Sequence, residues 1–134
     1  MTRFSITLDQ GVDFVISCLE RMWGGELFVP KIPSYKIMDV VKAILPSGNV
    51  KDIGIRSGEK LHEEMITNTD SLNTIEFRDY FVILPSIPLW DLEKFKMESS
   101  TSTGKYCKGG FSYNSLDNKV FLSVDELKVL INQL

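Results

Sequence analysis

Apolar residues recur every three or four positions in the first part of the chain, over residues 12–22. This spacing predicts an amphipathic helix. Thr7 and Gln10 stand three residues apart ahead of it, the arrangement of a capping box at a helix start. Gly24 and Gly25 then end the helix, because glycine readily adopts the left-handed backbone that closes many helices.

After this helix the pattern predicts short strands and short helices in turn. Ser123 and Glu126 form a second capping box ahead of a closing helix. The other expected elements are a strand at Glu26–Val29 stopped by Pro30, a helix from an N-cap at Ser34 to a stop before Pro46, a strand at Val50–Ile55, a short helix at Glu59–Ile66, and strands at Thr74–Phe77 and Tyr80–Leu84. This order is that of a small α/β domain.

The length of 134 residues fits one domain, which we expect to extend over residues 1–134. A hydrophobic fraction of 43% and a charged fraction of 25% place the chain among ordinary globular proteins. Residues 96–110 are polar, so we expect a mobile loop within the domain there. No stretch is apolar over the length that spans a bilayer.

The net charge of −3 argues against nucleic acid or an anionic membrane as a partner, because the sequence contains no run of basic residues. Cys18 and Cys107 are too few for a disulfide framework in so small a chain. We interpret both as free thiols in a reducing compartment. The first residues also lack the pattern of a secretory leader, and we therefore expect a cytoplasmic protein.

The segment from Ile53 to Met65 indicates a strand, then a glycine-bearing turn, then the start of a helix. In the turn, Arg56 can meet phosphate oxygens with its planar, charged guanidinium, next to the free N–H groups of a helix start. Glu59 can accept hydrogen bonds from a diol such as a ribose. The pattern is compatible with a nucleotide site, but from the spacing alone a solvated surface pair is the favoured interpretation, because such turns are common. A P-loop is excluded, because its glycine and lysine spacing is not met.

This segment, GIRSGEKLHEEMI, closely resembles the GIRPGEKLHEE signature of the inverting UDP-N-acetylglucosamine 4,6-dehydratases. Four further blocks resemble successive parts of the same family: MTRFSITLDQGVDFVISCLERM, GGELFVPKIPSYKI, DYFVILPSIPLWD and GGFSYNS. The similarity covers nearly the whole chain and is weakest over Glu93–Lys108. These enzymes act in pseudaminic acid and related polysaccharide pathways and belong to the extended short-chain dehydrogenase superfamily. The resemblance implies an α/β fold, the small substrate-binding lobe of such an enzyme, without the Rossmann domain.

The resemblance also implies roles for individual residues in binding a UDP-sugar. Arg56 matches an arginine that faces the diphosphate, Glu59 matches the acid that faces the ribose, and Arg3 looks like a second phosphate-facing arginine. Lys31 and Tyr35 flank a strand-to-helix turn and are weaker candidates to line the nucleotide base. The alternative for these two is an ordinary structural role.

Two residues depart from the pattern of the family. Ser57 replaces the usual proline, which removes a restraint on φ in the turn but retains a hydroxyl. Ser5 stands where an aromatic residue is common, so the packing around Arg3 is expected to differ. Neither change removes a charged group.

The chemistry of the family needs groups that this sequence does not contain. These enzymes oxidise the sugar at carbon 4 with NADP, eliminate water across carbons 5 and 6, and return the hydride. None of the four tyrosines is followed by the lysine of a Tyr-x-x-x-Lys pair, and the glycines of a dinucleotide fingerprint are missing. We therefore expect no catalytic residue in this chain and place NADP in a missing amino-terminal lobe. Met1 coincides with an internal methionine of the family, which predicts a truncated or split gene or an excised part.

Three hypotheses remain open: a substrate lobe of a dehydratase, a non-catalytic UDP-sugar-binding module, and a folded structural remnant. The expected partners are a UDP-sugar, a separately encoded cofactor lobe, and further copies of the chain, because a lobe without its neighbour exposes apolar surface. No metal site is expected, because His62 is the sole histidine. We expect His62 to be a solvated helix residue.

Overall fold

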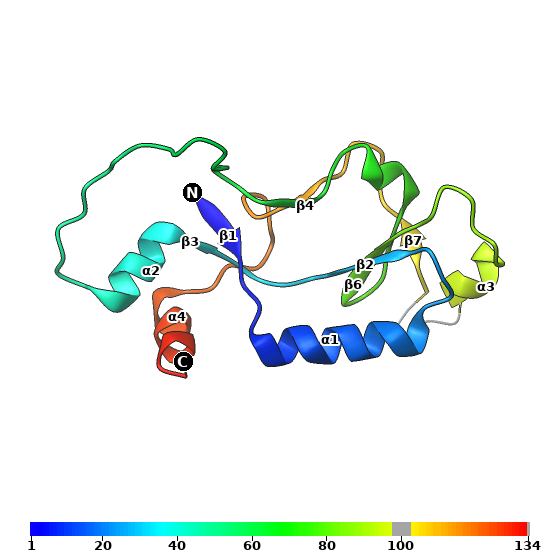
Figure 1. The fold of residues 1–134 in the computed structure, drawn as a ribbon, viewed down its shortest axis with the longest axis horizontal. Coiled ribbons are helices and arrows are strands. Elements are labelled where there is room, and N and C mark those ends of the chain that lie inside the picture. The colour runs from blue at the N-terminus through cyan, green and yellow to red at the C-terminus, as the bar shows by residue number, and fades with distance from the viewer. Residues whose placement is uncertain (98–102, 134) are drawn as a thin grey trace. The chain divides into compact units, whose positions relative to one another are not determined.

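The computed structural model describes residues 1–97 and 103–133. These residues form two compact units (Figure 1). We call Met1–Ser5, Ile32–Glu64 and Asn114–Leu134 the terminal unit, and Ile6–Lys31 and Met65–Tyr113 the sheet unit. Among the described residues, no helix has both the length and the apolar character needed to cross a membrane.

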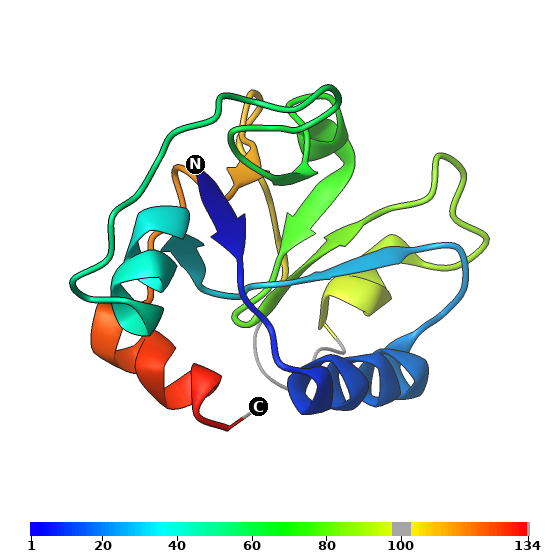
Figure 2. The ribbon, with the colours of Figure 1, turned by 60° about the vertical axis from the view of Figure 1, so that its left-hand side comes forward.

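The sheet unit is built on a four-stranded antiparallel sheet in the order β2-β6-β5-β7. The strands are β2 (Leu27–Pro30), β5 (Thr74–Glu76), β6 (Tyr80–Ile83) and β7 (Lys105–Tyr106). The helices are α1 (Leu8–Arg21), α3 (Leu92–Met97) and the 3-10 helix η1 (Asp70–Asn73). Figure 2 shows the strands and α1 from a second side.

One face of this sheet carries the main hydrophobic core. Side chains alternate between the faces of a strand, so Tyr80 and Val82 of β6 point to the face opposite that of Phe81. On the first face they pack with Ile75, Phe77 and Phe95 of α3, and Phe14 of α1 adds to this cluster. On the other face, the Phe81 ring lies 5.1 Å from that of Tyr113. The aromatic and β-branched residues of these two strands thus explain both why the sheet forms and why α3 packs against it.

The capping box expected before α1 is confirmed. The Thr7 hydroxyl accepts from the Gln10 backbone N–H at 3.2 Å, and the Gln10 side chain accepts from the Thr7 N–H at 3.1 Å. The strands expected at Thr74–Phe77 and Tyr80–Leu84 are confirmed within one residue at the carboxyl end. Pro30 was expected to stop a strand, but β2 includes it, because β2 is an edge strand and proline is tolerated there.

The terminal unit contains a two-stranded antiparallel sheet and two helices. Strand β1 (Thr2–Phe4) pairs with β3 (Ser34–Lys36), and α2 (Ile37–Ile44) follows β3 directly. Helix α4 (Val124–Ile131) begins at the predicted capping box and packs against α2 (Figure 2). The short strands β4 (Glu64–Ile66) and β8 (Tyr113–Asn114) pair with each other where the chain passes from one unit to the other.

Three sequence-based expectations about the terminal unit are wrong. Ser34 is not a helix N-cap but the first residue of β3, and its backbone bonds to Val120 and Leu122 instead. Val50–Ile55 is not a strand. The Gly54 N–H donates to the Asp52 carboxylate at 2.8 Å, and Gly54 has a φ of +77°, which breaks the extended backbone.

The third wrong expectation is the helix at Glu59–Ile66. In a helix, the backbone carbonyl groups of this segment would accept hydrogen bonds from N–H groups four residues further along. Instead, the Leu61 carbonyl accepts from the Thr2 N–H at 3.0 Å, and the Glu63 carbonyl accepts from the Ser115 N–H at 2.8 Å. No helix or strand occurs between Ile44 and Glu64. The end of this segment instead becomes β4.

The loop expected at residues 96–110 is described only in part, because residues 98–102 lie outside the described residues. Of the rest, α3 extends to Met97 and β7 occupies Lys105–Tyr106. Gly104 is buried beside Ile75 and Phe77. The predicted mobility stays a prediction.

Candidate functional site

The candidate site is built around the turn from Arg56 to Glu59. The Glu59 N–H donates to the Arg56 carbonyl at 3.1 Å, and the Arg56 N–H donates to the Glu59 carboxylate at 3.1 Å. Gly58, third in the turn, has a φ of +81°, which is the geometry of a type II turn. The second position of such turns favours proline, and here it is Ser57. A turn held by its own glutamate therefore replaces the expected helix start.

Within this turn, the Arg56 side chain is the available cation. It is exposed, and none of the described residues forms an ion pair or a side-chain hydrogen bond with its guanidinium. The Glu59 carboxylate is about one-third exposed, with one oxygen on the Arg56 amide. The turn therefore presents one free guanidinium and one partly engaged carboxylate, three residues apart.

Arg3 lies next to this turn and is much more enclosed. Its Nη2 is 3.9 Å from Glu59 Oε1 and its Nε is 3.6 Å from Glu63 Oε1. Its Nη1 donates to the Thr2 carbonyl at 2.7 Å and to the Leu61 carbonyl at 3.3 Å. Two carboxylates and two carbonyls thus surround the guanidinium of Arg3.

Tyr35 lies on the strand that pairs with the one carrying Arg3. The register places Tyr35 directly opposite Arg3, and directly opposite residues of an antiparallel pair project to the same face. The structure thus places Arg3 beside Glu59 of the turn and Tyr35 opposite Arg3, so that four of the five residues expected from the sequence lie in the terminal unit. Whether any of them binds a ligand stays a prediction.

Lys31, the fifth residue, belongs to the sheet unit and is held there by internal partners. Its Nζ donates to Glu76 at 2.7 Å and to the Phe77 carbonyl at 2.6 Å, and it lies 4.7 Å from the centre of the Phe81 ring. The other four residues belong to the terminal unit. The part of Lys31 in binding a base stays a prediction.

Cys107 lies near the same lysine. Burial raises the pKa of its thiol to about 11, the nearby Glu76 adds to this rise, and Lys31 opposes it. Such a thiol is almost wholly protonated near neutral pH and is a weak nucleophile. The surroundings of Cys107 therefore do not indicate a reactive thiol.

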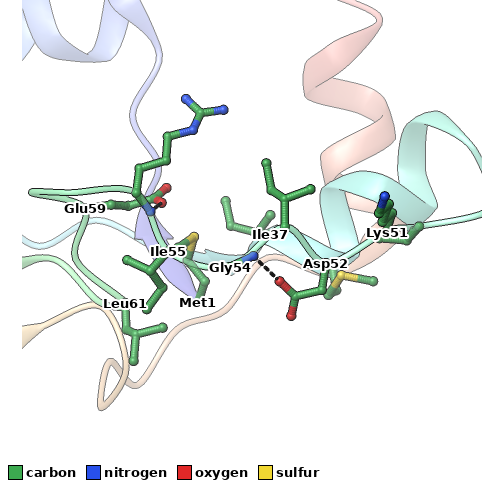
Figure 3. A pocket seen from close by; sticks show the side chains of 12 residues that line it. Met1, Ile37, Lys51, Asp52, Gly54, Ile55, Glu59 and Leu61 are labelled. Atoms are coloured by element: carbon green, nitrogen blue, oxygen red, sulfur yellow. Dashed lines mark hydrogen bonds between the residues drawn. The ribbon is translucent and has the colours of Figure 1, made fainter.

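A pocket of about 510 Å³ adjoins the turn in the terminal unit (Figure 3). Charged residues Lys51, Asp52, Arg56 and Glu59 line it together with Met1, Ile37, Met38, Val50, Ile53, Ile55 and Leu61. Its volume lies in the range of small-molecule sites, and the mixture of apolar surface with a few charged groups is typical of them. The pocket therefore has room for part of a nucleotide beside Arg56 and Glu59.

Sequence reasoning missed the network that fastens this loop to β1. Thr2 Oγ1 lies 2.7 Å from His62 Nδ1 and 2.7 Å from Ser115 Oγ, and the Glu63 N–H donates to Ser115 Oγ at 2.9 Å. His62 is thus a half-buried loop residue and not the solvated helix residue that was expected. The bonded residues of this network are 52 to 113 positions apart along the chain, so a local sequence pattern cannot predict it. The run of glutamates after His62 is the one local signal that could have suggested it.

Comparison with known proteins bears on this site. The family model described as polysaccharide biosynthesis protein matches residues 1–85. The chain belongs to this polysaccharide biosynthesis family. A UDP-N-acetylglucosamine 4,6-dehydratase (inverting) of Campylobacter jejuni subsp. jejuni serotype O:2 is 50% identical over 98% of this chain, which spans 40% of that relative. A UDP-glucose 4-epimerase of Rickettsia massiliae is 36% identical over 62% of this chain, which spans 26% of that relative.

A solved structure has the same fold. The chain in the X-ray structure of Pen from Bacillus thuringiensis matches with a TM-score of 0.75 and 29% identity, over 99% of this chain and 39% of the other. These findings confirm the predicted α/β fold class, part of an extended short-chain dehydrogenase, and the predicted family. The chain is thus a region related to sugar-nucleotide dehydratases of the polysaccharide biosynthesis family, and it spans about 40% of the length of two such curated relatives.

The described residues of this family member do not fit NADP. The strand pairs of its sheets run antiparallel in β1–β3 and β2-β6-β5-β7, whereas dinucleotide domains place a glycine-rich turn between parallel strands. The tyrosines also lack the lysine four residues on. Within the described part of the chain, no three His, Cys, Asp or Glu side chains lie together as metal ligands.

The helix α1 of this family member exposes apolar residues along one side. These are Leu8, Val12, Val15, Ile16 and Leu19, together with Met22 directly after the helix, all at least 49% exposed. Several of them line a second pocket, of about 570 Å³, that also includes Ile6 and Gly11. An apolar surface of this kind is typical of a protein contact.

Proposed function

We propose that this chain is the UDP-sugar-binding part of a UDP-N-acetylglucosamine 4,6-dehydratase of polysaccharide biosynthesis. The observation that carries the proposal is the Arg56–Glu59 turn on the edge of the 510 Å³ pocket, in a chain 50% identical to such an enzyme. A free guanidinium and a carboxylate three residues apart suit a diphosphate followed by a ribose.

In this proposal Arg56 binds the diphosphate through charge-assisted hydrogen bonds. Glu59 accepts hydrogen bonds from the ribose hydroxyl groups with the lone pairs that the Arg56 amide leaves free. Lys31 is not needed for this grip, because Glu76 and the Phe77 carbonyl already hold its ammonium. Tyr35 stays a candidate for the base, because it lies opposite Arg3.

The chain contributes binding and no chemical step in this proposal. NADP and the residues that transfer protons and hydride belong to the larger part of such an enzyme that this chain does not span. The alternative is a UDP-sugar-binding module without a catalytic role. It predicts the same contacts with the ligand in a chain that does not associate with a cofactor lobe. Co-purification of the chain with a protein that bears Tyr-x-x-x-Lys would separate the two. A cytoplasmic location suits either function.

The apolar side of α1 supports the proposed partners. In a complete enzyme the cofactor-binding part would cover it, and in the chain by itself a second copy would do so. Sedimentation velocity on residues 1–134 should therefore show an oligomer, and Leu19→Asp, at a position 64% exposed, should shift it toward monomer. A monomer at all concentrations would contradict self-association.

The binding test is a titration with UDP-N-acetylglucosamine followed by the melting temperature. Ligand at about a hundred times its Kd should add roughly 2.7 kcal/mol of stability. Arg56→Ala should remove this gain, whereas Arg78→Ala, a change to an exposed arginine of the sheet unit, should retain it. No shift at millimolar ligand in a chain that melts cooperatively would contradict the proposal and favour a structural remnant.

A further inference from the structure

A network of side-chain hydrogen bonds adjoins one wall of the 510 Å³ pocket. Met1 and Leu61 line that pocket, and the next residue after each, Thr2 and His62, belongs to the network. The Thr2 N–H also donates to the Leu61 carbonyl at 3.0 Å. The network therefore connects β1 to the segment that directly follows the turn of the candidate site.

The number of available hydrogens gives this network a single direction. The Glu63 N–H donates to Ser115 Oγ at 2.9 Å, and Thr2 Oγ1 lies 2.7 Å from both Ser115 Oγ and His62 Nδ1. The amide and the two hydroxyl groups supply one hydrogen each. Three hydrogens serve these three contacts only if Ser115 donates to Thr2 and Thr2 donates to His62. The imidazole is then a neutral ring that accepts at Nδ1 and carries its hydrogen on Nε2.

Protonation of this ring would disrupt the network. A neutral imidazole takes up a proton at the nitrogen that has no hydrogen, and here that nitrogen is Nδ1. Four hydrogens would then share three contacts, so that the hydroxyl of Thr2 or Ser115 would lose its acceptor. These two residues are 4% and 0% exposed. The hydroxyl would therefore be buried without a partner, which is unfavourable.

The charged groups near His62 come from its own segment, from β1 and β3, and from the residues after β8. They are Glu63 and Glu64, the Met1 amino group and Arg3, Lys36 opposite Thr2, and Asp117. The carboxylates of Glu63, Glu64 and Asp117, which line a pocket of about 250 Å³ with His62, attract a proton to the ring. The hydroxyl network opposes a proton at Nδ1. Acid therefore favours an imidazolium that the network does not accommodate.

We propose that His62 is a positioning residue of the nucleotide site, which acts through Thr2 and only as a neutral imidazole. With the network complete, Leu61 and His62 are fixed to β1, and the preceding turn is ordered before the ligand binds, which lowers the ordering cost of binding. Protonation of His62 releases this segment and weakens binding. The inference rests on the proposed function and adds to it a dependence on pH.

The test is a titration of the unmodified chain with UDP-N-acetylglucosamine at several pH values between about 8 and about 5.5, the range in which histidine ordinarily changes charge. Both phosphates of this ligand are esterified, so its charge is constant over the range. The Kd should rise about fivefold as the pH falls, the factor for one lost hydrogen bond. The midpoint should coincide with the titration of the His62 ring in NMR spectra, which is readily assigned because His62 is the sole histidine.

Three variants distinguish this role from a merely structural one. His62→Asn retains a hydrogen-bond acceptor near the place of Nδ1 but does not titrate, so its Kd should be the same at every pH in the range. Thr2→Val removes the hydroxyl from a side chain of the same shape, and it should weaken binding in neutral solution and abolish the dependence on pH. Thr2→Ser is the matched control, because it retains the hydroxyl and should retain the dependence.

The direction of the network has a readout that needs no ligand. Nitrogen NMR spectra distinguish the two ring atoms and should show the hydrogen of the neutral ring on Nε2; a hydrogen on Nδ1 would overturn the inference. A Kd that is independent of pH in the parent, or that rises in acid equally in the parent and in His62→Asn, would overturn it while the proposed function stands. A parent chain that does not bind UDP-N-acetylglucosamine at any of these pH values overturns both.

Discussion

The sheet unit and the terminal unit bury different kinds of side chain. Among the described residues, the sheet unit buries mainly apolar and aromatic groups, with Ile75 and Val82 fully enclosed. Of the described residues of the terminal unit, the hydroxyl residues Thr2, Ser34 and Ser115 and one apolar residue, Leu127, are buried, whereas Ile53 is 75% exposed. The first arrangement is stabilised by removing apolar surface from water, and the second by hydrogen bonds whose geometry is specific.

This difference explains where a candidate site is found. A close-packed apolar core tolerates little change and presents no polar groups to a ligand. A loop fastened by hydrogen bonds, such as the one that carries Arg56 and Glu59, can expose charged groups in a fixed geometry. We therefore expect core substitutions in the sheet unit to have the larger effect on stability, and substitutions in the turn of the terminal unit to have the larger effect on ligand binding.

The largest expected effect is that of removing a fully buried isoleucine. Ile75→Ala in the sheet unit should lower the free energy of unfolding by about 2–5 kcal/mol, because Ile75 is 0% exposed and packs against Phe77 and Val82. The same change at Ile53 should cost less than about 0.5 kcal/mol, because that side chain is mostly exposed. Urea denaturation measures both. Equal costs would contradict the contrast between the units.

A smaller effect is expected from adding a methyl group to the same core. A Cβ on Gly104 would lie 2.6 Å from Ile75 Cγ2 and 2.7 Å from the Phe77 ring, so Gly104→Ala should cost about 1–3 kcal/mol. Gly109 has no atom closer than 3.9 Å to such a Cβ. Gly109→Ala should therefore leave the stability unchanged. Thermal unfolding of the two variants distinguishes the cost of steric crowding at Gly104 from the general effect of replacing a glycine.

In the terminal unit, the turn of the candidate site should gain from proline. Ser57→Pro should raise the free energy of unfolding by about 0.4–1 kcal/mol, because proline restricts the unfolded chain and suits the second position of a type II turn. It should also tighten UDP binding, since the turn is then ordered beforehand. Calorimetric titration and urea denaturation measure the two effects.

The control for this change is Gly58→Ala, which should destabilise, because Gly58 has a φ of +81° that other residues adopt at a cost. A destabilised Ser57→Pro variant would show that the turn is not of type II.

The smallest expected effect is a change in how stability depends on pH when the helix caps of α4 and α1 are altered. In the terminal unit, hydrogen bonds from the Ser123 side chain and then from its backbone N–H lower the pKa of Glu126. A lowered pKa in the folded state stabilises the protein above the unfolded value of 4.5, and this contribution is lost as the pH falls through the folded value. Ser123→Ala should therefore reduce the loss of stability below pH 4.5.

The capping box of α1 in the sheet unit provides the control, because its third residue is the amide Gln10 and not a carboxylate. Thr7→Ala should lower stability by the same amount at every pH between 3 and 7. Melting temperatures measured over that range test both caps. A pH-dependent effect at Thr7 would point to a titrating group other than the cap.

Elements with local sequence signals could be predicted from the sequence. The capping boxes of α1 and α4, and the strands β5 and β6, depend on residues within a few positions of one another, and all are where the sequence predicts them. The family was likewise readable, because ordered blocks of sequence carry it. The same local reading singled out Arg56 and Glu59 as neighbours in one turn.

The conformation of the segment from Pro46 to Glu63 could not be predicted in the same way. The sequence predicts a strand and a helix here. Local bonds at Gly54 break the strand, and in place of the helix Leu61 and Glu63 bond to residues more than fifty positions away, namely Thr2, Phe4 and Ser115. Such long-range partners replace the local bonds of a helix, and no local pattern encodes them. For the same reason the enclosure of Arg3 by Glu59, Leu61 and Glu63 could not be predicted from the sequence.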